Sequence, residues 1–246
     1  MIRYIDYIFG KLQGFLYTPF VLGDYFKFKR KNDGRFALRI KDLYPCVREK
    51  TAKISFDRHY VYHTAWAARK VEEINPKFHI DISSSISFSA ILSAFVPVKF
   101  YDYRPAELNL SGLTSGKADL AALPFADGSI QSLSCMHVVE HVGLGRYGDK
   151  IDPTGDLKAI GELKRVLAPG GFLLFVVPMG RPKIQFNAHR IYGYDQIREY
   201  FNDLELKEFS LIPARAEDGG IIYDATKERA DHESYGCGCF LFKKSG

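Results

Sequence analysis

Three aspartates lie where successive strands of an alternating strand–helix chain are expected to end. Asp81 and Asp102 each close a short apolar segment, and Asp119 follows a third strand. In a doubly wound parallel sheet, neighbouring strand ends lie side by side and ligands bind beyond them. A carboxylate after the second strand can accept hydrogen bonds from both hydroxyls of a ribose. The three acids therefore predict a nucleoside site at one sheet edge. The alternative interpretation is ordinary turn chemistry, because aspartate often ends strands.

The elements that would hold these acids alternate along the chain. An uninterrupted apolar run at 172–178 is typical of a central strand that is covered on both faces. Helical patterns fall at 63–74, 88–95, 155–167 and 194–201, and strand patterns at 78–82, 98–102, 129–136, 172–178, 204–212 and 235–243, while a short third strand is expected to finish at 118–120. This alternation predicts an α/β fold with a doubly wound, mostly parallel, seven-stranded sheet.

The clearest helical pattern lies between residues 155 and 167. Apolar side chains recur there at three- and four-residue spacing, which predicts one buried helical face made of Leu157, Ile160, Leu163, Val166 and Leu167. The Ala-Pro-Gly-Gly sequence at 168–171 then breaks the helix before the apolar strand.

Three consecutive motifs carry a family resemblance. The segment Asp119-Leu-Ala-Ala-Leu-Pro-Phe-Ala-Asp-Gly-Ser129 leads into a strand and then into His137-Val-Val-Glu-His-Val142, and Glu162-Leu-Lys-Arg-Val-Leu-Ala-Pro-Gly-Gly-Phe172 follows. Together they resemble the middle of class I S-adenosylmethionine-dependent methyltransferases, over roughly residues 76–215. The aromatic-rich front, residues 1–57, and Tyr60 to Trp66 resemble a poorly characterised, methyltransferase-like branch of unknown function. The resemblance implies a Rossmann-like methyltransferase domain.

The resemblance also implies an S-adenosylmethionine site. By family position, the cofactor-binding residues would be Asp81, Ile82, Ser83 and Ser85 at the methionine part, Asp102 and Tyr103 at the ribose, Asp119 and Leu120 at the adenine, and His137 and Val138 near the sulfonium. The first loop departs from the family, which has Asp-x-Gly-x-Gly where this chain has three serines. A serine at positive φ would be strained by about 1 kcal/mol and would weaken cofactor binding. At negative φ its hydroxyl could hydrogen-bond the ligand's carboxylate.

Catalysis in such a site depends mainly on placing the acceptor in line with the activated methyl group. An alcohol or phenol acceptor must also lose a proton, and His141 is the first candidate base, with His137 second and Glu140 as an orienting partner. His189 and Arg190 follow the fifth strand and are candidates for binding an acceptor, particularly an anionic one. The alternative is structural: histidines at strand ends often act as caps or pack in the core, and 189–190 would be an exposed connector.

Bulk composition narrows the remaining classes. A net charge of +5 without a dense basic stripe argues against nucleic-acid binding. The four cysteines form no C-x-x-C pair and no zinc spacing, so free thiols, no metal and a cytoplasmic location are expected. No secretory signal and no membrane-spanning apolar run is evident. The chain also lacks the phosphate-binding loop, the dinucleotide glycine motif and the hydrolase elbow.

The front of the chain differs from the body. Residues 1–57 are expected to form an aromatic-rich extension that packs on or covers a domain at 58–246. The spacing of apolar residues at 1–28 is compatible with an amphipathic helix. A basic cluster at 27–31 leaves peripheral membrane or polyanion contact open. Two main hypotheses result: methyl transfer to a small-molecule or glycan-type acceptor, or an inactive methyltransferase-like protein used for binding or scaffolding. The oligomeric state is not predicted.

Overall fold

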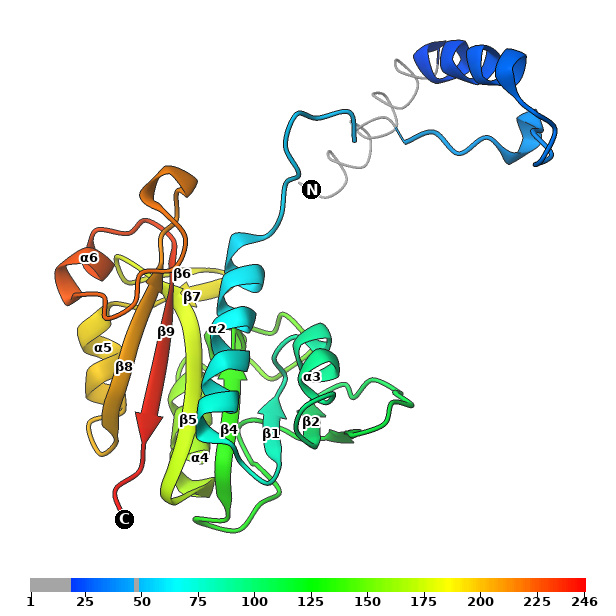
Figure 1. Cartoon of the computed structure of the whole chain (residues 1–246). Helices are drawn as coiled ribbons and strands as arrows, with labels where there is room; N and C mark the ends of the chain where they lie inside the picture. The colour runs from blue at the N-terminus through cyan, green and yellow to red at the C-terminus, as the bar shows by residue number, and fades with distance from the viewer. Residues whose placement is uncertain (1–18, 47–48) are drawn as a thin grey trace. The chain divides into compact units, whose positions relative to one another are not determined.

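A computed structural model describes residues 19–46 and 49–246, and the chain divides into two units, Met1–Phe56 and Asp57–Gly246 (Figure 1). In the first unit, residues 19–31 are helical and a 3-10 turn, η1, spans Ile40–Asp42. Tyr25 is buried within this unit. Positions 1–18 of the amphipathic helix expected at 1–28 lie outside the described residues.

The second unit is built on a seven-stranded sheet, as predicted. Its order is β3-β2-β1-β4-β5-β9-β8, and β9 runs antiparallel to both of its neighbours, while the other pairs are parallel. The strands are β1 (His79–Ile82), β2 (Val98–Asp102), β3 (Leu113–Lys117), β4 (Ile130–Met136), β5 (Leu167–Met179), β8 (Glu205–Ile212) and β9 (Gly236–Lys243).

Helices cover both faces of this sheet (Figure 1). One apolar cluster joins α2 (Arg58–Ile74) and α3 (Ile86–Leu92) to one face, with Trp66 at 1% exposure near its centre. A second cluster joins α4 (Gly155–Val166) and α5 (Tyr194–Tyr200) to the other face. The result is a three-layer α/β architecture whose central strands are buried on both sides.

Several elements differ from those expected: β3 ends at Lys117, before 118–120, and β5 already begins at Leu167, so residues 168–171 lie within it. Helix α2 begins at Arg58, earlier than expected, because the Asp57 side chain accepts a hydrogen bond from the backbone N–H of Tyr60 and caps the helix. An unexpected hairpin of β6 (Lys183–Gln185) and β7 (His189–Ile191) follows β5. The remaining short elements are the 3-10 turns η2 (Val139–His141) and η3 (Ala216–Asp218) and the helix α6 (Lys227–Asp231).

Helix α4 buries a narrower face than its spacing predicts. Ile160, Leu163 and Val166 are buried, but Leu157 is 43% exposed, so the prediction for Leu157 is wrong. Asp156 takes the buried position in the first turn, because its carboxylate accepts a hydrogen bond from the Tyr192 hydroxyl at 3.0 Å. The next residue, Leu157, is turned by about 100° around the helix axis and so lies outside the buried face.

A chain of buried hydrogen bonds crosses β1 and β4. The Ser132 hydroxyl and His79 Nδ1 are 2.8 Å apart, and His79 Nε2 lies 2.9 Å from the Ser134 hydroxyl. Ser134 in turn donates to Asp81 Oδ1 at 2.6 Å, and Ser89 of α3 donates to the other carboxylate oxygen. With the proton of a neutral His79 on Nε2, each group has a partner. The chain therefore ties two strands and a helix together beneath the strand ends.

None of the helices within 19–46 and 49–246 combines the length and apolar character that a membrane crossing requires.

Replacing Leu163 by alanine should destabilise the domain strongly. The side chain is fully buried in the α4 cluster, so its removal leaves a cavity and is expected to lower the free energy of unfolding by about 2–5 kcal/mol. Leu157→Ala on the same helix is the matched control and should change it by no more than about 0.5 kcal/mol. Urea denaturation of both variants checks this, and equal losses would contradict the packing described.

Asp81 should make stability depend on pH. Burial raises the pKa of its carboxyl from 3.8 to about 6, against the hydrogen bonds from Ser134, Ser84 and Ser89. Between these values the folded protein holds a proton that the unfolded chain has released, so stability falls as pH rises. Compared with Asp81→Asn, the wild-type free energy of unfolding should fall by up to about 1.4 kcal/mol per pH unit across this range.

His79 provides a control, because its effect on the free energy of unfolding should change with pH in the opposite direction. Burial lowers the pKa of His79 from 6.5 to about 3, so its contribution to stability grows as pH rises through the same range. Urea denaturation from about pH 4 to 7 should therefore give differences of opposite slope for Asp81→Asn and His79→Gln. A flat difference for Asp81→Asn would show that its carboxyl titrates normally in the folded protein.

Candidate functional site

A cavity of about 300 Å³ lies beyond the carboxyl ends of the parallel strands. Its walls come from the loop after β1, the end of β2 and the segments that follow β3 and β4. Of the residues predicted from the sequence, it brings together Ser83, Asp102, Tyr103, Asp119, Leu120, His137, Val138 and His141. The register of β2 with β1 and β3 explains this, because the three strands end at one edge.

Asp102 and Asp119 each present a carboxylate to the cavity. One oxygen of Asp102 accepts a hydrogen bond from the backbone N–H of Arg104 at 2.7 Å, and one oxygen of Asp119 accepts from that of Ala121 at 2.9 Å. These local turns hold both carboxylates in place. Among the described residues, nothing hydrogen-bonds the second oxygen of either group. Two acceptors are thus left for a ligand.

Asp81, Ile82 and Ser85 do not line the cavity. Asp81 is fully buried beneath it and is held by serine hydroxyls, while Ile82 packs in the core at 1% exposure. Ser85 precedes α3 as its N-cap residue. The predicted direct contacts of these three side chains with a ligand are therefore not what the structure shows. Asp81 and Ile82 instead anchor the end of β1 in the protein interior.

Ser83 is the member of the first loop that faces the cavity. It stands where the family has its first loop glycine, and its φ is +54°, in the left-handed region. Its backbone N–H and its hydroxyl both donate to the Tyr101 carbonyl, at 2.7 and 3.2 Å. These bonds hold a conformation that a residue with a Cβ adopts at a cost.

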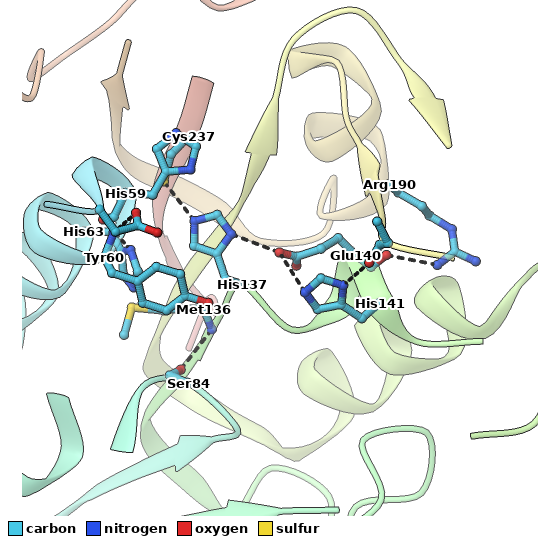
Figure 2. Close-up of polar contacts among 12 residues, drawn as sticks. His59, Tyr60, His63, Ser84, Met136, His137, Glu140, His141, Arg190 and Cys237 are labelled. Carbon is cyan, nitrogen blue, oxygen red and sulfur yellow. Dashed lines mark hydrogen bonds and ion pairs between the residues drawn. The ribbon is translucent and has the colours of Figure 1, made fainter. Parts of the chain in front are cut away.

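His137 occupies a constrained position after β4. Its φ is +57°, and its Nδ1 donates to Glu140 Oε1 at 2.9 Å. Its Nε2 lies 3.4 Å from Cys237 Sγ (Figure 2). Glu140 is buried, and its other carboxylate oxygen has no hydrogen-bond partner among the described residues. Glu140 therefore orients His137 directly, rather than His141 as the sequence suggested.

His141 has the properties of a neutral base. Its Nδ1 lies 2.6 Å from the Ala188 carbonyl and 3.1 Å from a guanidinium nitrogen of Arg146, which also donates to Ala188, and its Nε2 lies 3.7 Å from Glu140 Oε1. Burial lowers the pKa of this imidazole, outweighing the opposite effect of Glu140. His141 is thus unprotonated near neutral pH and lies in the cavity wall.

Aromatic and imidazole rings from α2 gather around His137 (Figure 2). The His59 ring stacks on it at 5.4 Å with an interplanar angle of 8°, Tyr60 stacks at 5.5 Å, and His63 meets it edge-on at 5.0 Å. Burial and the His137 ring lower the pKa of His59 to about 4. Burial also raises the pKa of Tyr60 to about 12. Trp66, further along the same helix, belongs to the core cluster and takes no part in this group of rings.

Arg190 does not line the cavity, so its predicted role in binding an acceptor is wrong. Its side chain is buried, donates to the Val142 carbonyl at 2.7 Å and pairs with Asp156 at 3.4 Å. The guanidinium fastens the segment after β4 to α4, so it is not available to an anionic acceptor. His189 lies on β7 outside the cavity wall, with its ring 6.3 Å from that of His141.

The loop at 143–150 supplies cavity residues that sequence reasoning missed. The Asp149 carboxylate accepts from the backbone N–H groups of Gly143 at 2.8 Å, Gly145 at 3.3 Å and Tyr147 at 3.1 Å, which shapes the loop over the cavity. Three glycines at positive φ, at 143, 145 and 148, permit this turn, and their spacing was the available signal. The additional wall residues are Arg104, Ala118, Val142, Tyr147, Asp149 and Lys150.

The strain at Ser83 can be measured with a pair of variants. Ser83→Gly and Ser83→Ala both lose the hydroxyl, but only alanine keeps the Cβ at positive φ, so the glycine variant should be more stable by about 1 kcal/mol. Ser84, which lacks a positive φ, is the matched control, and there alanine should be the more stable of the two. Thermal unfolding of the four variants checks both orders, and a more stable Ser83→Ala would contradict the left-handed conformation.

Comparison with known proteins agrees with this architecture. The family described as "Caenorhabditis protein of unknown function, DUF268" matches residues 127–212, and no curated protein matches the chain. The [4+2]-cyclase SpnF is 13% identical, with a TM-score of 0.54 over 80% of this chain and 85% of that chain. An S-adenosylmethionine-dependent methyltransferase from Thermotoga maritima is 13% identical, with a TM-score of 0.50 over 76% of this chain and 94% of that chain. The chain thus has the fold of the class I S-adenosylmethionine-dependent methyltransferases.

Proposed function

We propose that the cavity binds S-adenosylmethionine and that the protein transfers its methyl group to a small-molecule or glycan-type acceptor. The observation that carries this proposal is the pair of carboxylate oxygens on Asp102 and Asp119, which face one cavity and have no hydrogen-bond partner among the described residues. Two acceptors at neighbouring strand ends suit a ribose and an adenine amino group. The cavity volume of about 300 Å³ is at the lower end of ordinary ligand sites.

The surrounding residues fit the parts of this cofactor. Asp102 and Tyr103 would hold the ribose, and Asp119 and Leu120 the adenine. Ser83 would face the methionine part, with its backbone already turned as a glycine would turn it. The bound cofactor supplies a sulfonium-activated methyl group.

The protein's own contribution to catalysis is placement and removal of a proton. His141 is unprotonated and lies in the cavity wall beside Val138. With Nδ1 donating to Ala188, its Nε2 would accept a proton from an alcohol or phenol acceptor. The bond to Ala188 orients the ring, so His141 is the base in this proposal, and His137 packs behind it.

A second candidate function is binding without catalysis. The fold alone does not decide the reaction, since it is shared with a [4+2]-cyclase as well as with methyltransferases. The strained Ser83 favours this alternative, because a Cβ where the family has a glycine narrows the approach to a ligand. A cytoplasmic location belongs to either proposal, and it is supported by the free thiols of Cys46, Cys135, Cys237 and Cys239.

Removal of one carboxylate tests the cofactor site. In calorimetric titration, the wild-type protein should bind S-adenosylmethionine and S-adenosylhomocysteine saturably. Asp102→Asn keeps the acceptor for the Arg104 N–H but loses the charge, and it should weaken both ligands by roughly 10–100-fold. The matched control is Asp203→Asn, which removes an exposed carboxylate paired with Lys164 outside the cavity and should bind as the wild type does.

Two outcomes separate the candidate functions. Binding of S-adenosylmethionine followed by S-adenosylhomocysteine formation with a pool of small metabolites, lost in His141→Ala, supports methyl transfer. Binding without turnover supports the non-catalytic alternative. If a folded wild-type protein binds neither ligand, the cofactor proposal fails altogether.

A further inference from the structure

Three metal-ligating side chains from distant parts of the chain converge next to the cavity. They are His59 in the first turn of α2, His137 after β4 and Cys237 at the start of β9, and one ligand atom of each lies within 4.8 Å of the others. Antiparallel pairing places Cys237 opposite Pro178 at the end of β5, so β9 begins at the edge where the parallel strands end. Helix α2 brings His59 to the same place (Figure 2).

The two histidines are held in the way that metal ligands usually are. His137 Nδ1 donates to the buried Glu140 carboxylate, which leaves the lone pair on Nε2, 3.4 Å from Cys237 Sγ. The His59 ring is held between those of His137, at 5.4 Å, and Tyr235, at 5.1 Å. Histidines that bind metal generally donate their second N–H to a carboxylate or a backbone carbonyl, as His137 does. Both rings are therefore oriented before any ion arrives.

Unpartnered polar atoms surround the cluster. His63 is completely buried, its Nδ1 donates to the His59 carbonyl at 2.6 Å, and its Nε2 has no hydrogen-bond partner among the described residues. Its ring lies 5.0 Å from that of His137. One carboxylate oxygen of Glu140 is likewise buried and has no hydrogen-bond partner among the described residues. Buried polar groups without partners are rare, and each one calls for a missing group such as an ion or a water.

We propose that His59, His137 and Cys237 bind a divalent transition-metal ion of the zinc type. Imidazole and thiolate are the ligands that zinc prefers, and three protein ligands leave a fourth position open, as in catalytic zinc sites. A thiolate at Cys237 together with the Glu140 carboxylate would balance the two positive charges of the ion, which a buried site needs. His137 also lines the cavity, so the ion lies beside the ligand site. This proposal goes beyond the methyl-transfer proposal and does not depend on it.

Metal content and cobalt spectroscopy on the full, untagged chain test the site. Dialysed wild-type protein should retain about one equivalent of zinc. Replacement by Co²⁺ should give a thiolate-to-cobalt charge-transfer band. Cys237→Ala and His59→Gln should each lose the bound metal, and Cys237→Ala should lose the band. Glu140→Gln, which keeps an acceptor for His137 Nδ1, should weaken zinc binding by about 10–100-fold.

The matched control is Cys135→Ala, which removes a buried thiol from the opposite core cluster and should keep both the zinc and the cobalt band. Circular dichroism of each variant shows whether it is folded. The proposal is overturned if folded wild-type protein binds neither Zn²⁺ nor Co²⁺, or if Cys237→Ala keeps the cobalt band. Binding of S-adenosylhomocysteine by metal-free protein is measured separately, so the failure of one proposal is distinguishable from that of the other.

Discussion

The parallel pairing of β1 between β2 and β4 is the constraint on which the candidate site depends. It places Asp81 opposite Phe100 on one side and Ser134 on the other, and it brings the three strand ends to one edge. The buried chain from His79 through Ser134 to Asp81 is formed only in this register. A slip of one residue would turn every side chain of β1 to the opposite face and would break that chain. Cavity and core are therefore specified together.

The order of elements was largely readable from the sequence, and so was half of the site. Asp102 and Asp119 were found because an acid directly after a predicted strand must lie at the strand end. The same reasoning misplaced Asp81, because position along a strand does not reveal which face a side chain occupies when both faces are buried. Arg190 was misjudged since its contacts with Val142 and Asp156, far away in the sequence, bury it, and no local pattern predicts them.

The His59–His137–Cys237 cluster was beyond sequence reasoning for a different reason. His137 and Cys237 are 100 residues apart, and no local spacing connects them. Only the antiparallel return of β9 and the start of α2 bring the three together. Local motifs reveal sites made by one loop, whereas this cluster is a product of the complete topology. The left-handed backbone conformations of Ser83 and His137 could not be predicted from local sequence either. The tertiary surroundings decide whether a residue with a side chain adopts a positive φ.

The position of β9 also bears on how the domain is made. This strand follows β8 in the sequence but lies between β5 and β8 in the sheet. Until β9 has been synthesised, the long apolar β5 has an open edge, which is a template for mispairing with other chains. Synthesis from the amino end thus leaves the nascent domain vulnerable to aggregation until a late moment. That edge is closed only when β9 pairs along β5 from Phe172 to Met179.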